Sequence, residues 1–195
     1  MISRLHLSAI IVVAVGTVVA VLWASDEPVS WAWLMSIGAS VGVTLGAMTA
    51  FDRWLWQMPW LQGWFVKRPH LWGEWNVEIR SHWEDPETGQ RPDPIAATFS
   101  IRQTYSAVHL RMRSDESQGD LTSAKLVEGS DGRYTLAGIY RNEPDLAVRN
   151  RSQIHNGALL LEEEGQPNCP TELRGKYWTD RGTQGEIVAI RRQAV

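Results

Sequence analysis

Four side chains near the C-terminus are of types that could together bind a small anionic ligand. They are an aromatic ring, two hydroxyls and a guanidinium within seven residues: Tyr177, Thr179, Arg181 and Thr183. An aromatic ring stacks on a nucleobase, and a guanidinium with hydroxyl neighbours holds a phosphate. Trp75 offers a second stacking surface. We therefore interpret these five residues as candidate ligand contacts.

The same stretch also permits a purely structural interpretation. Gly175 and Gly185 would relieve crowding between paired strands, while threonine and aspartate residues are common in tight turns. Both interpretations stay open from the sequence alone.

Arginine dominates the basic residues from Pro69 onward, with 13 arginines and only two lysines. Its rigid fork suits bidentate contact with phosphate. The same region holds 19 acidic residues, and this excess of negative charge argues against binding along DNA or RNA. A compact phosphate-bearing ligand fits better, although most of these arginines are expected to pair with surface carboxylates.

Catalytic patterns are scarce, and we interpret the chain as not an enzyme. The five histidines are scattered without the spacing of a metal-binding helix, and no phosphate-binding glycine loop or serine nucleophile motif occurs: His6, His70, His82, His109 and His155. A single cysteine, Cys169, excludes an internal disulfide and a thiolate zinc site. No metal or cofactor is expected, and Glu162–Glu164 is interpreted as a solvated strand end.

The elements that must position these residues are short strands with two-residue alternation of apolar and polar side chains. The expected strands are 72–83, 95–103, 107–114, 121–128, 133–141, 154–163, 172–179 and 184–192. The segments 129–132, 156–157 and 180–182 are expected to be hairpin turns, so neighbouring strands should pair antiparallel. We predict an all-β domain over 69–195, a compact eight-stranded up-and-down, lipocalin-like β-barrel. An open two-sheet sandwich is the alternative.

The chain before this domain is of a different kind, because its first 51 residues contain only three charged side chains, Arg4, Asp26 and Glu27. Two uncharged stretches, about 5–23 and 31–51, are each long enough to cross a bilayer, which predicts a two-helix transmembrane hairpin. A cleaved signal peptide is the alternative for the first stretch. The acidic turn and the basic flanks place both termini in the cytoplasm.

Two further features belong to this region. Seven of the 11 tryptophans lie at or beyond the helix ends, and segment 52–68 is interpreted as a Trp-rich interfacial juncture. Gly38, Gly42 and Gly46 follow one another at four-residue spacing, which allows another helix to approach closely. That helix could belong to the same hairpin or to another copy of the chain.

The chain resembles the two-transmembrane β-barrel effectors of CBASS anti-phage defence, a family of CD-NTase-associated, β-strand-rich effectors. The resemblance rests on the order of a two-helix anchor, a Trp-rich juncture, and two motifs. These motifs are Pro69-x-x-Trp72-Gly73-x-Trp75 and Gly175-x-Tyr177-Trp178-Thr179-Asp180-Arg181-Gly182-Thr183-x-Gly185.

The resemblance implies that the barrel binds a cyclic dinucleotide made by a partner cGAS-like nucleotidyltransferase. It also implies that binding promotes oligomerisation and disruption of the bacterial inner membrane, ending in abortive infection. The alternatives are a membrane-tethered lipocalin-like lipid carrier and a partner-recruiting module. A lipid carrier would hold an apolar ligand inside the barrel.

Overall fold

The computed structural model describes residues 11, 15, 16, 19, 23, 31–165 and 169–192. The chain divides into two compact units, Met1–Leu55 and Trp56–Val195. The first unit contains helix α2, Trp31–Arg53, whose basic residue Arg53 stands in the last turn and complements the helix dipole. A helix is thus present over the expected stretch 31–51 and runs two residues further.

The expected first helix, 5–23, lies largely outside the described residues. Among the residues that the structure does describe, no helix combines the length and the apolarity that a bilayer crossing requires.

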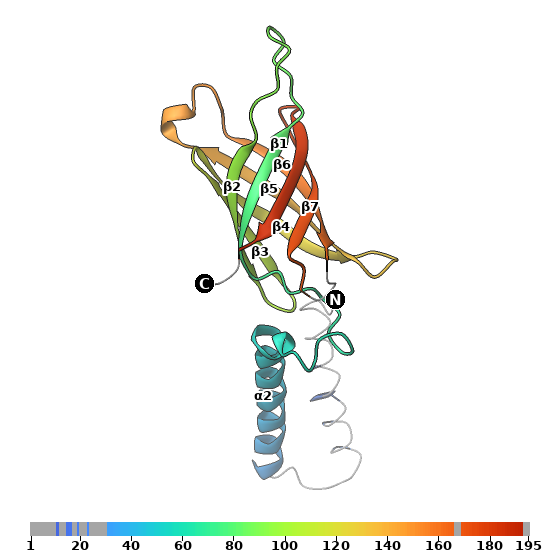
Figure 1. The fold of residues 1–195 in the computed structure, drawn as a ribbon. Helices are drawn as coiled ribbons and strands as arrows, with labels where there is room; N and C mark the ends of the chain where they lie inside the picture. The colour runs from blue at the N-terminus through green and yellow to red at the C-terminus, as the bar shows by residue number, and fades with distance from the viewer. Residues whose placement is uncertain are drawn as a thin grey trace. The chain divides into compact units, whose positions relative to one another are not determined.

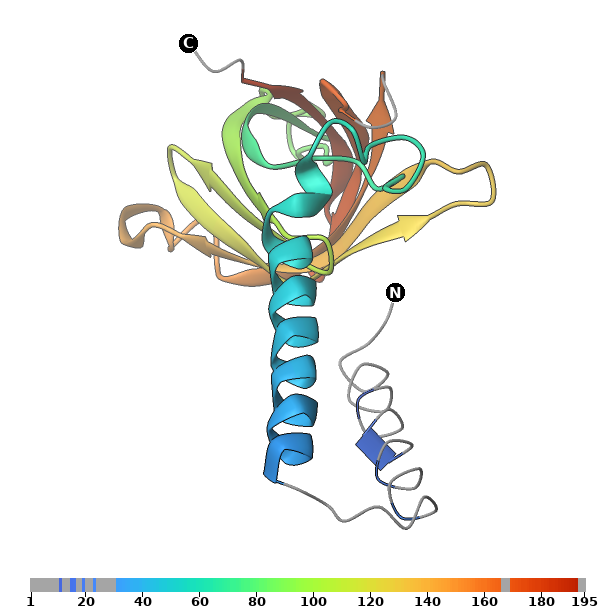
Figure 2. The same ribbon diagram turned by 90° about the horizontal axis from the view of Figure 1, so that it is seen from below.

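The described residues of the second unit form eight strands in a closed barrel (Figures 1 and 2). The strands are β1 Gly73–Ser81, β2 Ile95–Gln103, β3 Val108–Ser114, β4 Ser117–Glu128, β5 Tyr134–Pro144, β6 His155–Glu164, β7 Glu172–Thr179 and β8 Gln184–Arg191. Each strand pairs antiparallel with the next, and β8 returns to β1 from Trp75↔Arg191 to Ser81↔Gly185. The predicted up-and-down barrel is confirmed, and the sandwich is excluded.

Alternation of side chains divides the barrel wall into a dry inner face and a wet outer face. In β1, Trp75, Val77 and Ile79 are buried, whereas the residues between them are exposed. The largest inward side chains, including Phe99 and Leu161, are fully buried in one continuous core. Each such side chain contributes about 1.5–3 kcal/mol when it leaves water, so this core holds the barrel together.

Three expectations about the strands were wrong in detail. Strand β4 begins at Ser117 rather than Leu121, because Ser114 and Ser117 make a tight turn in which the Ser117 N–H donates to Ser114 Oγ at 3.1 Å. The pair Asn156-Gly157 lies inside β6 and is not a turn. Glu163, expected in a solvated strand end, faces inward and is buried.

One end of the barrel is closed by the chain that leads into β1. The amide of Gln103 accepts a hydrogen bond from Leu71 N at 2.7 Å and donates to Pro69 O at 2.9 Å. Trp56, expected among lipid headgroups, is instead fully buried, and its ring lies 5.6 Å from that of His70. Burial, and then the nearby Arg191 charge, lower the pKa of His70, which favours the neutral form of its imidazole.

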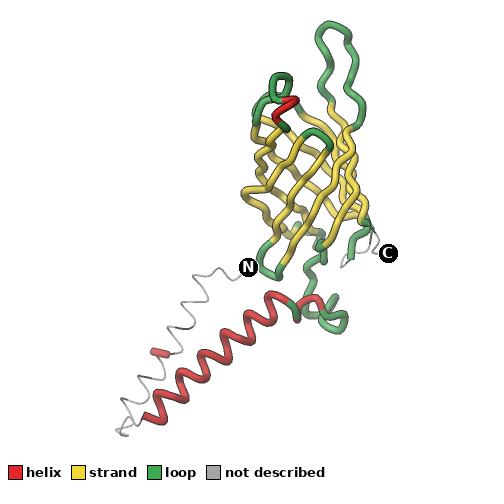
Figure 3. Tube along the Cα trace, turned by 90° about the vertical axis from the view of Figure 1, so that its left-hand side faces the viewer, coloured by secondary structure: helices red, strands yellow, loops and turns green. Residues whose placement is uncertain are grey.

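The opposite end carries the longest connection of the barrel, the β1–β2 loop over 82–94, which projects beyond the strands (Figures 1 and 3). Asp85 organises its tip, because Asp85 Oδ1 accepts from the N–H groups of Glu87 and Thr88 at 2.8 and 3.2 Å. An ion pair of 2.7 Å joins Arg91 to Glu84 across the loop. The loop is therefore held by contacts of its own.

Candidate functional site

A cavity of about 880 Å³ lies inside the barrel at the end from which the β1–β2 loop projects. This volume is within the usual range of small-molecule sites, roughly 300–1,000 Å³. Its floor is apolar, including Leu110, Leu159 and Ile187, and its upper wall is polar. The polar and aromatic residues that line it are Ser81, Trp83, Ser114, Asp115, Glu116, Ser117, Tyr140, Asn142, Arg151, Ser152, His155, Tyr177, Thr179, Arg181 and Thr183.

The turn between β7 and β8 supplies one side of this cavity. The Thr179 and Thr183 hydroxyl oxygens are 2.7 Å apart, and the Thr183 N–H donates to Thr179 Oγ1 at 3.3 Å. Asp180 Oδ2 accepts from the backbone and side-chain nitrogens of Asn156 at 3.0 and 3.2 Å. The backbone hydrogen bond from Asn156 is the main cause that lowers the pKa of Asp180. The turn is thereby fixed to β6.

Two tyrosines, Tyr140 and Tyr177, stand below this turn and are nearly buried. Burial, with Tyr177 and then Asp180 nearby, raises the pKa of Tyr140, so its hydroxyl keeps its proton and can donate a hydrogen bond. The space for each ring depends on a glycine. A Cβ at Gly157 would lie 2.4 Å from Tyr140 Cζ, and one at Gly185 would lie 2.8 Å from Tyr177 Cε1.

Cationic and anionic groups meet at the cavity mouth. Arg181 donates to Ser152 Oγ at 3.4 Å, a long hydrogen bond that leaves most of the guanidinium available to a ligand. Arg151 is ion-paired with Glu116. Arg151 is therefore paired directly with a carboxylate, whereas Arg181 donates to a neutral hydroxyl and interacts with Asp180 only through its charge.

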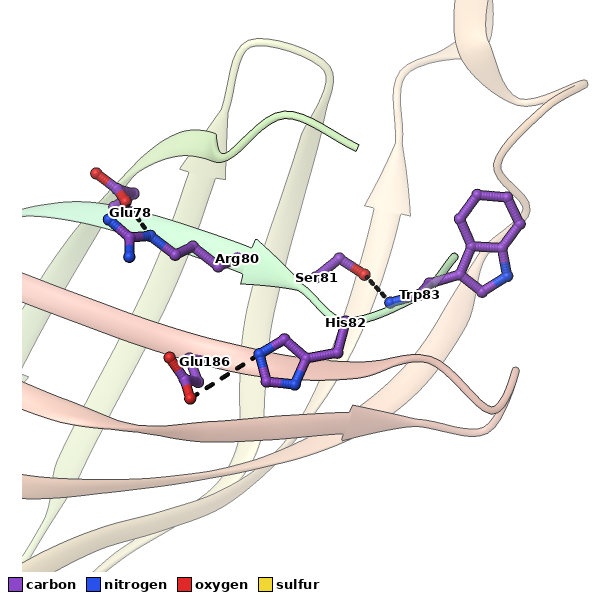
Figure 4. A network of polar contacts seen from close by, with 6 residues as sticks. All are labelled: Glu78, Arg80, Ser81, His82, Trp83 and Glu186. Carbon is purple, nitrogen blue, oxygen red and sulfur yellow. Dashed lines mark hydrogen bonds and ion pairs between the residues drawn. The ribbon is translucent and has the colours of Figure 1, made fainter. Parts of the chain in front are cut away.

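Trp83 is the second residue of the β1–β2 loop and lines the same cavity with 45% of its surface exposed. Figure 4 shows its indole directed away from the end of β1, while the backbone before it stays with the barrel. The His82 N–H donates to Gln184 O at 2.8 Å, and the Trp83 N–H donates to Ser81 Oγ at 3.2 Å. The indole thus lies at the mouth on an anchored backbone.

The structure brings together four of the five predicted ligand contacts, since Tyr177, Thr179, Arg181 and Thr183 all line the cavity. Trp75 is elsewhere: it is fully buried, its indole N–H donates to Leu71 O at 3.0 Å, and Arg191 lies 5.2 Å from its ring centroid. The glycines also have the structural role considered above. A Cβ at Gly175 or Gly185 would lie within 2.0 Å of a backbone carbonyl oxygen.

Sequence reasoning missed Trp83, Tyr140, Asn142 and Arg151 as cavity residues. For Asn142 a signal was present, because it follows Leu136 and Tyr140 at even spacing and so occupies an inward position with a polar side chain. A signal was present for Trp83 as well, because the strand expected over 72–83 places it in phase with the inward residues Trp75 and Ile79, although β1 itself ends at Ser81. Arg151 lies beyond the strands, where alternation gives no direction.

Two other expectations concern the rest of the chain. A methyl group added at Gly42 or Gly46 of α2 would meet no atom of the described residues within 4 Å. Gly38 belongs to the same helix. No group of three or more His, Cys, Asp or Glu side chains in the described part of the chain could hold a metal ion.

Comparison with known proteins identifies the class to which this barrel belongs. Residues 66–191 match the family described as "Cap15, cyclic dinucleotide receptor domain", and the chain belongs to that family. Two relatives are named CD-NTase-associated protein 15. The one from Staphylococcus schleiferi is 25% identical over 157 residues, covering 80% of this chain and 78% of the relative. The one from Yersinia aleksiciae is 30% identical over 120 residues, covering 62% and 53%.

The resemblance inferred from the sequence is thereby confirmed: the chain is a CD-NTase-associated β-barrel effector of CBASS. The family is defined as a receptor domain, in agreement with the shortage of catalytic patterns in the sequence.

Proposed function

We propose that the barrel binds its cyclic dinucleotide in the cavity at the loop-bearing end. The observation that carries this proposal is the cavity itself, about 880 Å³ in volume, which combines an apolar floor with a wall of hydroxyls, tyrosines and arginines. A cyclic dinucleotide presents flat bases and two phosphates, and both kinds of surface are needed to bind it.

Within this cavity the phosphates would be held by Arg181 and by the hydroxyls of Thr179 and Thr183, which the turn keeps in place. The bases would stack on Tyr177 and on Trp83 at the mouth. Trp75, also predicted as a stacking residue, would act indirectly by fixing the closed end. The ligand would come from a partner cGAS-like nucleotidyltransferase, and the chain would act as a receptor with no chemical step of its own.

We further propose that residues 1–51 anchor the chain in the bacterial inner membrane, with both termini and the barrel in the cytoplasm. Support comes from the near absence of charge in that region. Ligand binding would promote oligomerisation through Gly38, Gly42 and Gly46, and the assembled segments would disrupt the membrane and cause abortive infection. A ligand can do this only by binding the assembled state more tightly than the resting state.

The test is a titration of the purified full-length chain with a panel of cyclic di- and trinucleotides, followed by calorimetry and thermal unfolding. A specific ligand at a hundred times its dissociation constant should stabilise the fold by about 2.7 kcal/mol. A folded protein that responds to no member of the panel would contradict the proposal. Lipid found in the cavity of such a protein would favour the lipid-carrier alternative.

A further inference from the structure

Three polar side chains are buried in the part of the chain that the structure describes, and they use their hydrogen-bonding groups differently. They are Gln103, Asn142 and Glu163. Gln103 lies at the closed end, where both ends of its amide are occupied by the backbone of 69–71. The Gln103 amide therefore has a structural role, because both its oxygen and its nitrogen have hydrogen-bond partners within the chain.

Asn142 is the contrasting case. It projects inward from β5 with 7% of its surface exposed, and β5 pairs it with Gly119 on β4 and His155 on β6. Its Oδ1 atom is shielded from solvent and finds no hydrogen-bond partner among the described residues. A buried carbonyl in this condition is unfavourable and calls for a partner that enters from outside the chain.

The position of Asn142 allows such a partner to reach it, because Asn142 lines the cavity. Its neighbour Gly119 contributes no side chain, and a Cβ there would already be 3.5 Å from Asn142 Oδ1. Glu163 also has one oxygen with no partner in the described chain, but it does not line the cavity. Its other oxygen accepts from Tyr134 N at 3.1 Å.

We propose that Asn142 reads one base of the ligand through its side-chain amide, an inference that rests on the cavity being the ligand site. An asparagine amide offers an acceptor beside a donor. It can therefore bind the N6 amino group and N7 of adenine together, whereas guanine presents two acceptors at the same edge. The ligand class that fits is a cyclic dinucleotide with at least one adenine.

The rest of the site is consistent with this assignment. Arg181, Thr179 and Thr183 belong to the β7–β8 turn, whereas Asn142 belongs to β5, with β6 between them. The groups suited to phosphate and the group suited to a base edge are thus on different strands, as a ligand with both parts requires. Trp83 adds a flat apolar surface from a third element.

The experiment compares wild type, Asn142→Leu and Asn142→Asp as full-length purified chains. Each is titrated by calorimetry with cyclic di-AMP, cyclic di-GMP and cyclic AMP–GMP. Asn142→Leu should weaken adenine-bearing ligands by roughly tenfold or more, since a bidentate base contact is lost. Asn142→Asp should bind cyclic di-AMP more weakly without gaining affinity for cyclic di-GMP, because a carboxylate accepts from the N6 amino group but cannot donate to N7, and guanine presents two acceptors at the same edge. Asn76→Ala, an outward asparagine on β1, is the matched control and should bind as wild type does.

Thermal unfolding without ligand shows whether Asn142 contacts a base of the ligand or instead stabilises the fold. Asn142→Leu removes an unsatisfied buried carbonyl and should leave the melting temperature unchanged or higher. A marked fall in melting temperature with unchanged affinities would overturn the inference, as would an equal loss for all three ligands. Wild type that binds no member of the wider panel of cyclic di- and trinucleotides would instead overturn the proposed function. Wild type and Asn142→Leu binding equally well would overturn the inference alone.

Discussion

The side-chain oxygens of Thr179 and Thr183 lie 2.7 Å apart across the turn that joins β7 to β8. The same turn is tied to β6 through Asp180 and Asn156, so the two hydroxyls are held in place by hydrogen bonds of the chain itself. Arg181, between them in sequence, donates a hydrogen bond to the neutral hydroxyl of Ser152. The turn is thus prepared to receive an anion.

Replacing Arg181 with alanine should weaken cyclic dinucleotide binding by about ten- to a hundredfold, since a charge-assisted hydrogen bond contributes roughly 1.5–3 kcal/mol. Calorimetry measures the loss, and circular dichroism should report an unchanged barrel. Arg102→Ala, on the outer face of β2, is the matched control. An Arg181→Ala protein with wild-type affinity would remove this residue from the site.

Trp83→Ala should weaken binding by about tenfold, in the range found when one base loses an aromatic stacking partner. Trp178→Ala is a close control, because Trp178 is exposed to a similar extent, 43% against 45%, but does not line the cavity. Quenching of tryptophan fluorescence by ligand should persist in the control and diminish in Trp83→Ala. Equal behaviour of the two variants would contradict a stacking role for Trp83.

Gly157→Ala should destabilise the barrel, because a methyl group there would lie 2.4 Å from Tyr140 Cζ and 2.7 Å from Trp178 O. Overpacking of this kind costs about 1–3 kcal/mol, which lowers the melting temperature by about 5 °C or more. Gly119→Ala provides the comparison, since its methyl would meet the flexible Met112 Cε at 3.3 Å. A similar melting temperature for both variants would contradict this account of Tyr140 packing.

Glu163→Gln should stabilise the fold at neutral pH. Burial raises the pKa of the Glu163 carboxyl, against smaller opposing contributions from Tyr134 N and Arg133. A raised pKa means that folding favours the protonated form, so stability is highest below the ordinary pKa of glutamate and falls as pH rises through the folded value. Glutamine mimics the protonated form. Its advantage in melting temperature should therefore be largest near pH 7 and vanish near pH 4, and an advantage independent of pH would contradict the argument.

Gly42→Leu should prevent ligand-dependent assembly while leaving ligand affinity unchanged, because leucine fills the surface that close helix packing needs. Val43→Leu, one residue along the same helix, is the control. Cross-linking in membranes and growth of expressing cells measure the effect. Wild-type toxicity from Gly42→Leu would show that this helix surface is not the functional contact.

The sequence was sufficient to predict the barrel, because alternation in β1, β3 and β8 indicates which face is dry, and short turns favour sequential pairing. The sequence-based prediction failed where residue types that are common in turns lie inside strands. Gln118 and Asp120 flank Gly119 like turn residues, yet they pair in β4. Asn156-Gly157 is typical of a turn, yet Gly157 is needed in β6 to make room for Tyr140.

The candidate site was predictable only in part. Tyr177, Thr179, Arg181 and Thr183 come from one hairpin, so their proximity follows from local spacing. Tyr140 and Asn142 come from β5, and only closure of the barrel brings β5 and β7 around one cavity. Trp75 was wrongly predicted as a ligand contact. Alternation shows that its side chain faces the barrel interior, but it does not show at which end of the barrel the residue lies.

Closure of the barrel by β1 and β8 also has a consequence for biosynthesis. Translation delivers β1 early and β8 last, while their pairing joins Trp75 to Arg191 across most of the domain. Contacts between such distant positions form slowly, and until they form both terminal strands expose unpaired edges. A ribosome that stalls before β8 would therefore leave an open, aggregation-prone sheet, and the cavity that receives the signal would exist only once the whole chain has been made.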